Sequence, residues 1–233
     1  MAVKKGKNYR KSLEKVEKDF YTIEEAVKMI KETSVVKFDA TAELHVNLNI
    51  DPKKADQQIR GTVSLPHGTG KKVRIAAIVT DDKVKEAKDA GADAAGLEDL
   101  IEEFSKGKID YDIIIATPDT MKKIGKVAKT LGQKGLMPNP KSGTVTPEVG
   151  KTIKELKAGR IEYRNDKQGG VHTLFGKVSF KEAELENNLK TAIRAIRDAK
   201  PSGVKGTFIK SISLSSTMGP GINLDLAQAL KAL

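Results

Sequence analysis

Strict alternation of apolar and polar residues between positions 41 and 50 is the feature that most constrains the fold of this chain. A period of two residues is that of a β-strand with one buried face. The intervening residues are polar and would lie on the other side of the strand. The segment therefore predicts a sheet with a polar outer face. The apolar members of the alternation are Ala42, Leu44, Val46, Leu48 and Ile50.

Both ends of the chain add helices and strands of the same kind. A capping box at Thr22 and Glu25 predicts a helix that ends near Thr33. A basic segment at 4–18 is expected to lead into a helix of its own. Neither end alone supplies a complete core, so we expect the two ends to pack together. The remaining predicted elements are strands at 60–65, 160–164, 171–175 and 207–217, with a turn at 165–170 and a helix at 181–200.

The middle third of the chain alternates strands with helices. Its strands are almost continuously apolar, as at Ile113–Ile115, which is typical of parallel strands covered on both faces. A long Gly- and Pro-containing segment at 132–150 follows, and a loop of that length is usually functional or disordered. We expect strands at 73–79 and 111–116, and helices at 81–90, 97–105, 118–131 and 151–157.

This change of pattern predicts two domains, one inserted into the other. Residues 1–67 and 159–233 would form a discontinuous α+β domain, and residues 68–158 an α/β domain. The sequence Gly68-Thr69-Gly70-Lys71 lacks the spacing of a phosphate-binding loop and precedes a strand instead of a helix. We therefore expect no nucleotide cofactor there.

The charge balance favours a polyanionic partner. The 233 residues include 42 Lys and Arg against 31 Asp and Glu, a net charge of +11. A field of this sign attracts nucleic acid. No apolar run is long enough to span a bilayer, and the first five residues lack the apolar core of a signal peptide. We expect no membrane association and a cytoplasmic protein.

Catalytic and metal-binding patterns are weak. The three histidines, His45, His67 and His172, are far apart in sequence, so we expect surface roles for His45 and His172 and no metal site. The chain contains no cysteine and no nucleophile elbow. Two alternatives to a specific RNA-binding protein remain open: an enzyme that uses a nucleotide bound to the middle domain, and a nonspecific basic chaperone or architectural protein.

Hydroxyl groups gather on the last predicted strand, at Ser211, Ser213, Ser215 and Thr217. Hydroxyls can bind phosphate, ribose and base edges, and an exposed phenyl ring such as Phe38 can stack on a base. An ordinary solvated sheet face would carry the same residue types. The pattern alone therefore favours RNA binding only together with the net charge.

Five segments together resemble one family of known proteins. The resemblance runs over nearly the whole chain, in the same order and at the same total length. The family is that of the bacterial large-subunit ribosomal protein called L-one. The segments are KFD at 37–39 with ELH at 43–45, RGTVSLPHG at 60–68, GLMPNPK at 135–141, RIEYRNDK at 160–167 and STMGP at 216–220.

The resemblance implies a fold and a function. The fold would be an α+β outer domain with a split βαβ sheet and an inserted Rossmann-like α/β domain without a nucleotide. The protein would be a structural constituent of the ribosome, not an enzyme, with no cofactor and monomeric when free. Its partners would be large-subunit rRNA at the mobile side stalk, deacylated tRNA leaving the exit site, and the leader of its own operon's mRNA, whose translation it would repress.

The resemblance also implies a set of RNA contacts. Lys134 and Lys141 in the 132–141 loop could add a second contact with RNA or tRNA. The positions that match the family's contact pattern are Lys37, Phe38, Thr41, Glu43, Asp166, Lys167, His172, Ser211, Thr217, Met218 and Gly219.

Overall fold

A computed structural model describes residues 6–233, which form two compact units. The terminal unit comprises the described residues up to Gly70 together with Gly159–Leu233, and the middle unit is Lys71–Ala158. The first boundary between the two units follows Gly70. Asn188 binds the backbone of His67 and Gly68, close to this boundary. Residues 1–5, where the predicted basic segment begins, lie outside the described residues.

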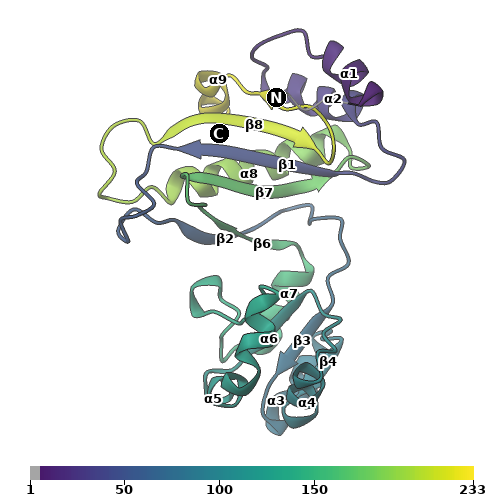
Figure 1. Cartoon of the computed structure of the whole chain (residues 1–233), viewed down its shortest axis with the longest axis vertical. Helices are drawn as coiled ribbons and strands as arrows, with labels where there is room; N and C mark the ends of the chain where they lie inside the picture. The colour runs from purple at the N-terminus through teal and green to yellow at the C-terminus, as the bar shows by residue number, and fades with distance from the viewer. Residues whose placement is uncertain (1–5) are drawn as a thin grey trace. The chain divides into compact units, whose positions relative to one another are not determined.

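A four-stranded antiparallel sheet forms the centre of the terminal unit, in the order β7-β1-β8-β9 (Figure 1). Strands β7 and β8 are joined through helix α8, and β1 lies between them, so the three elements form a split βαβ unit. The elements of the unit are α1 (Lys7–Glu14), α2 (Ile23–Thr33), β1 (Thr41–Leu48), β2 (Arg60–Ser64), β6 (Arg160–Arg164), β7 (Gly170–Lys177), α8 (Glu182–Asp198), β8 (Ile209–Ser216), β9 (Ile222–Asn223) and α9 (Leu226–Lys231).

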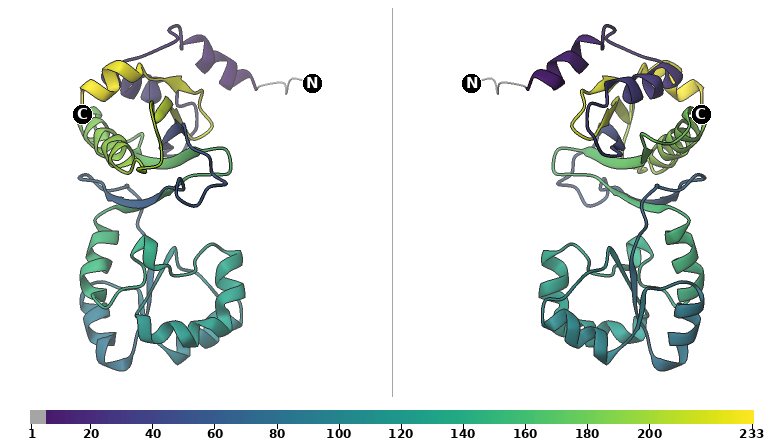
Figure 2. Two further views of the ribbon diagram at one scale, coloured as in Figure 1. Left: turned by 90° about the vertical axis from the view of Figure 1, so that its left-hand side faces the viewer. Right: turned by 90° about the vertical axis from the view of Figure 1, so that its right-hand side faces the viewer.

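Helices α2 and α8 lie on one face of this sheet (Figures 1 and 2). The predicted alternation in β1 is confirmed, since Ala42, Leu44, Val46 and Leu48 are buried beneath the helices. The predicted capping box of α2 is also confirmed: Thr22 Oγ1 accepts a hydrogen bond from Glu25 N. Helix α8 buries one apolar stripe, which consists of Leu185, Leu189, Ala192, Ile193 and Ile196. Burial of each Leu or Ile side chain contributes roughly 1.5–3 kcal/mol.

One buried residue of α8 is polar. Asn188 is fully buried; its Nδ2 donates to the carbonyls of Gly68 and Phe175, and its Oδ1 accepts from His67 N. These three bonds satisfy backbone groups that would otherwise be buried without a partner. Asn188 therefore attaches the end of the first segment to α8.

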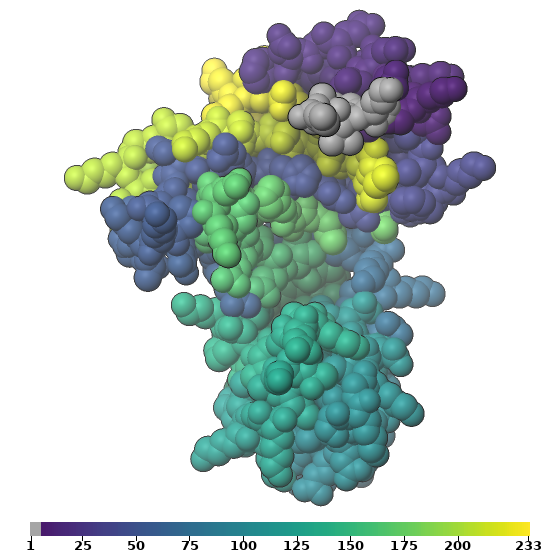
Figure 3. Space-filling view, viewed as in Figure 1, coloured from purple at the N-terminus to yellow at the C-terminus, as the bar shows by residue number. Residues whose placement is uncertain are grey.

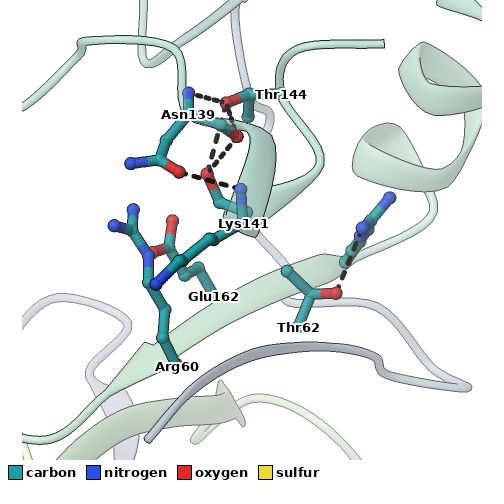
Figure 4. Close-up of polar contacts among 8 residues, drawn as sticks. Arg60, Thr62, Asn139, Lys141, Thr144 and Glu162 are labelled. Atoms are coloured by element: carbon teal, nitrogen blue, oxygen red, sulfur yellow. Dashed lines mark hydrogen bonds and ion pairs between the residues drawn. The ribbon is translucent and has the colours of Figure 1, made fainter. Parts of the chain in front are cut away.

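The prediction of two strands around the turn at 165–170 is correct for the strands, but they do not pair as a hairpin. Strand β6 pairs with β2 in a separate two-stranded sheet, while β7 pairs with β1. Only an isolated bridge joins Asn165 to Val171, and Asn165 Oδ1 instead accepts from Ile59 N. Arg60 and Glu162 form an ion pair across the small sheet, 2.5 Å between Nε and Oε1 (Figure 4).

The last two elements of the chain were not predicted from the sequence. Strand β9 adds to the edge of β8, and α9 follows it. Asp225 caps this helix, because its Oδ1 accepts from Gln228 N at 3.1 Å. In the predicted strand at 207–217, the alternation of apolar and polar residues breaks at Ile209 and Lys210. Lys210 is the extra residue of a β-bulge there, which accounts for the break.

The middle unit contains a three-stranded parallel sheet in the order β4-β3-β5. All four residues of β3 are buried, and successive residues enter two different apolar clusters on opposite faces. The predicted helix at 118–131 is broken into short α and 3-10 turns, and β4 was not predicted. The elements are β3 (Ile75–Ile78), α3 (Asp81–Asp89), β4 (Ala94–Gly96), α4 (Glu98–Ser105), β5 (Ile113–Ala116), η1 (Pro118–Thr120), α5 (Met121–Ile124), η2 (Gly125–Val127), α6 (Ala128–Gln133), η3 (Pro140–Ser142) and α7 (Val149–Lys157).

The two segments that connect the units, near Gly68 and Gly159, contact each other within the terminal unit. Leu65 N donates to Gly159 O at 3.2 Å. Gly159 has φ +108, and a Cβ added there would overlap Gly68 Cα. Only glycine fits this approach without strain. No helix among residues 6–233 is long and apolar enough to cross a membrane.

Candidate nucleic-acid interface

The candidate site lies on the face of β1, β7 and β8 opposite α2 and α8, which we call the polar face. No helix of the described chain covers it (Figure 2). Antiparallel pairing places polar residues of the three strands side by side: His45 lies opposite His172 on β7 and Ser213 on β8, and Asn47 lies opposite Ser211. The polar side chains of this face are Glu43, His45, Asn47, His172, Ser211, Ser213 and Ser215, and Leu174 lies opposite Glu43.

At one end of β1, a hydrogen-bonded junction connects the start of this strand to the end of β8. Thr41 N donates to Thr217 Oγ1 at 3.0 Å, and Thr217 N donates to Thr41 O at 3.0 Å. The Thr217 hydroxyl also lies 3.4 Å from Glu43 Oε1. Lys177 Nζ donates to Thr41 Oγ1 at 2.9 Å. The structure thus brings together three predicted site residues, Thr41, Glu43 and Thr217, and adds Lys177.

A strained turn follows this junction. Met218 has φ 65, an unfavourable conformation for a residue with a Cβ, and its side chain is 74% exposed. Gly219 N donates to Ser216 O at 2.7 Å, and a Cβ on Gly219 would overlap Ser216 Oγ. The turn therefore needs glycine at 219. It also holds an apolar side chain in solvent beside the junction.

Phe38 is a second exposed apolar residue near the start of β1, with 59% of its surface accessible. The neighbouring Asp39 is anchored, because its carboxylate accepts from Ser179 N and Ser179 Oγ at 3.1 and 2.9 Å. Lys37 is exposed on the same segment. An exposed ring on an anchored segment can stack on a base or ribose with little ordering cost.

The other predicted residues gather at the opposite end of β1. Asp166 Oδ1 accepts from Gln168 N and Gly170 N at 2.8 and 2.7 Å, and these bonds hold the pKa of its carboxyl below its usual range. His172 Nε2 lies 3.4 Å from Asp166 Oδ2. Lys167 is exposed in the same turn. Ser211 lies opposite Asn47 near this end of β1, whereas Thr217 lies beside Thr41 at the other end. His172 lies between them, opposite His45.

Two hollows flank the turn. One hollow, of about 640 Å³, includes Lys53, Arg164 and Lys167 in its lining. Figure 3 shows the loop at 51–58, in blue, beside the turn at 165–170, in green. The other, of about 290 Å³, is lined by residues of the polar face and the turn, including His45, His172 and Ser211. Three of the lining residues of the first hollow are thus basic, which suits a phosphate backbone.

The contacts of His45 were not predicted from the sequence. Its Nδ1 lies 2.9 Å from His172 Nδ1, and its Nε2 lies 3.0 Å from Ser215 Oγ. Burial lowers the pKa of the His45 imidazole and the adjacent His172 lowers it further, while Glu43 acts in the opposite direction. The two histidines are far apart in sequence, and only the strand register brings them together. Among residues 6–233, no group of three or more His, Cys, Asp or Glu side chains could hold a metal ion.

In the middle unit, the long Gly- and Pro-containing loop is folded around Asn139 (Figure 4). Asn139 Oδ1 accepts from Lys141 N at 2.8 Å, and Asn139 N donates to Thr144 Oγ1 at 2.8 Å. Both lysines are exposed, but Lys134 Nζ donates to Ile109 O at 3.2 Å. Of the two lysines predicted as a second contact, Lys134 is therefore bound to its own unit.

Comparison with known proteins connects this arrangement to a family. Residues 30–220 match the model of the ribosomal protein L1p/L10e family. The chain is 50% identical over 224 residues to the large ribosomal subunit protein uL1 of Thermus thermophilus, an alignment that covers 95% of this chain and 98% of that relative. It is 52% identical over 227 residues to the same-named protein of Chloroflexus aggregans, with 96% of each chain covered. This chain belongs to the ribosomal protein L1p/L10e family.

Proposed function

We propose that the chain is a component of the large ribosomal subunit that binds large-subunit rRNA through the polar face and the two ends of β1. The observation that carries the proposal is the Thr41–Thr217 junction beside the strained Met218 turn. Strained, exposed residues on a rigid sheet are typical of binding sites. Both relatives described above are named as large ribosomal subunit proteins. The net charge of +11 on this chain suits an RNA partner.

Binding would combine two kinds of contact. Basic side chains such as Lys37, Lys167 and Arg164 would supply salt-dependent attraction to phosphates. The junction and Phe38 would read the shape and ribose hydroxyls of a folded RNA. No bond is made or broken in this function, which needs no cofactor.

The finer roles follow from the family resemblance. The rRNA site would be the mobile side stalk, and stalk movement would assist release of deacylated tRNA from the exit site. The exposed Lys141 on the Asn139 loop is the better of the two lysines for a contact with tRNA or RNA. The protein would also repress translation of its own operon by binding the mRNA leader. The two compact units would be the RNA-binding domain and a Rossmann-like inserted domain.

A salt titration against three RNAs tests the proposal: the side-stalk fragment, the leader of the protein's own mRNA, and an unrelated duplex of equal length. We expect the stalk RNA to bind at least about a thousandfold more tightly than the duplex at physiological salt, by analogy with DNA-binding proteins. A leader affinity between these values supports the repressor role. Equal binding to all three RNAs would leave only a nonspecific basic protein.

A further inference from the structure

Met218 carries the most accessible thioether of residues 6–233. Three other methionines lie in this part of the chain. Met29 and Met121 pack, partly buried, against apolar clusters. Met137 is 36% exposed, and Met218 is 74% exposed. The proposed function places Met218 beside the RNA but gives no role to its sulfur.

The surroundings of Met218 favour attack on its sulfur. The chain contains no cysteine, so thioethers are its only sulfur-containing side chains. Hydrogen bonds fix the backbone on both sides of Met218. Thr217 N donates to Thr41 O. Gly219 N donates to Ser216 O. The turn is therefore held with Met218 at φ 65, a backbone that carries its side chain into solvent. An oxidant dissolved in water reaches this thioether first.

We propose, on the basis of the RNA-binding function above, that Met218 is a modification site, whose oxidation by a peroxide switches off RNA binding. The sulfur lone pair attacks one oxygen of hydrogen peroxide, so that an S–O bond forms and the O–O bond breaks. The hydroxide that leaves takes the remaining peroxide proton and becomes water. The sulfur is oxidised to a sulfoxide, and the peroxide is reduced. Methionine sulfoxide reductases, with electrons from a thiol, reverse the modification.

Oxidation makes an apolar side chain polar and leaves the turn in place. The hydrogen bonds that hold the turn come from backbone atoms and from the Thr217 hydroxyl, and none of them uses the Met218 sulfur. The fold of the terminal unit therefore persists. The sulfoxide oxygen is an acceptor, and so are the phosphate and ring oxygens of an RNA backbone. Burying this oxygen against RNA without a donor costs about tenfold to a hundredfold in affinity.

The first test maps oxidation of the free protein and needs no RNA. The wild type is treated with limiting hydrogen peroxide, and peptide mass spectrometry follows the sulfoxide at each methionine. We expect Met218 to be oxidised severalfold faster than Met137, and Met29 and Met121 to be oxidised last. Circular dichroism of the treated protein should match that of the untreated protein. Equal rates at Met218 and Met137 would overturn the proposal.

The second test measures affinity for the side-stalk rRNA fragment before and after the same treatment. Wild-type affinity should fall by about tenfold to a hundredfold, and a methionine sulfoxide reductase with a thiol should restore it. Met218→Leu, whatever its starting affinity, should not change with treatment. Met137→Leu is the matched control at the other exposed methionine, and its affinity should fall as the wild type's does. An equal loss in all three proteins would overturn the proposal, because oxidation elsewhere would then be the cause.

Failure of this inference and failure of the proposed function give different results. If the untreated protein binds stalk RNA no more tightly than an unrelated duplex of equal length, the RNA function itself fails. If the untreated protein prefers stalk RNA and keeps that affinity after Met218 is oxidised, only the role of the modification fails.

Discussion

The two main sheets of this chain follow opposite patterns of burial. In the terminal unit, β1 alternates buried and accessible residues, with helices on one face and polar side chains on the other. In the middle unit, all four residues of β3 are buried between two apolar clusters. A sheet with one accessible face can present a wide set of side chains to a partner. A sheet buried on both faces leaves binding to its loops.

The largest expected effect is a loss of stability on the face of the terminal sheet that the helices cover, in contrast to the polar face. Asn188→Leu should lower the free energy of unfolding of the terminal unit by about 3 kcal/mol, because it leaves buried backbone groups of His67, Gly68 and Phe175 without partners. Hydrogen exchange should show the loss in the terminal unit and little change in the middle unit. Asn187→Leu, at an exposed position of the same helix, is the control. Equal effects of the two substitutions would contradict the role given to Asn188.

At the junction of Thr41 with Thr217, substitution should affect RNA binding more than folding. Thr217→Val removes the hydroxyl that accepts from Thr41 N, and we expect affinity for stalk RNA to fall by about 1–3 kcal/mol. Thr217→Ser keeps the hydroxyl and should retain most of the affinity. Filter binding or calorimetry with both variants measures the difference. Unchanged affinity in Thr217→Val would remove Thr217 from the site.

In the middle unit, we expect substitution of Asn139 to destabilise only the loop at 132–150. Asn139→Ala removes the side-chain acceptor for Lys141 N and should cost about 1 kcal/mol, as loss of a helix cap does. Faster hydrogen exchange of the amides of Ser142 and Thr144 would show it. Lys141→Ala, which keeps the cap, should leave these amides protected but weaken any tRNA contact of the loop. Equal exchange in the two variants would argue against an organising role for Asn139.

The smallest effect concerns the turn beside the polar face. Backbone hydrogen bonds from Gly170 and Gln168 lower the pKa of Asp166 in the folded protein. Its stabilisation is therefore fully present above the unfolded value of about 3.9 and is lost as pH falls through the lower folded pKa. Asp166→Asn should be slightly less stable than wild type at neutral pH, and the two should converge in acid. Denaturant melts of both proteins at several pH values measure this difference in stability. A difference that stays constant with pH would contradict the role given to the carboxylate.

Sequence patterns predicted those parts of the fold that depend on local periodicity. The burial of β1, the capping box at Thr22 and the stripe of α8 follow from residue spacing alone. The pairing of β6 with β2 does not, because the two strands lie far apart in sequence and the Asn165 side chain binds Ile59 beside them instead of closing a hairpin. Helix α9 has only six residues, and its stability comes from the Asp225 cap and from Ala229 in the core.

The candidate site was predictable in composition but not in arrangement. The family resemblance named Thr41, Thr217 and Met218, but the strain at Met218 is visible only in the backbone. The contact of His45 with His172 depends on strand register, and a shift of one residue would place the rings on opposite faces. That register is set by long-range pairing of strands that lie far apart in the sequence.

The contact of Gly159 with Gly68 has a consequence for how the chain could evolve and be engineered. The chain leaves the terminal unit and returns to it at neighbouring points. The two ends of the inserted segment are therefore held together by contacts within the terminal unit. The entropy of closing a loop rises only slowly with its length. Residues 71–158 therefore behave, for the folding of their host, like a short surface connection. A different domain, or a few small residues, could replace them as a cassette, as long as both glycines remain.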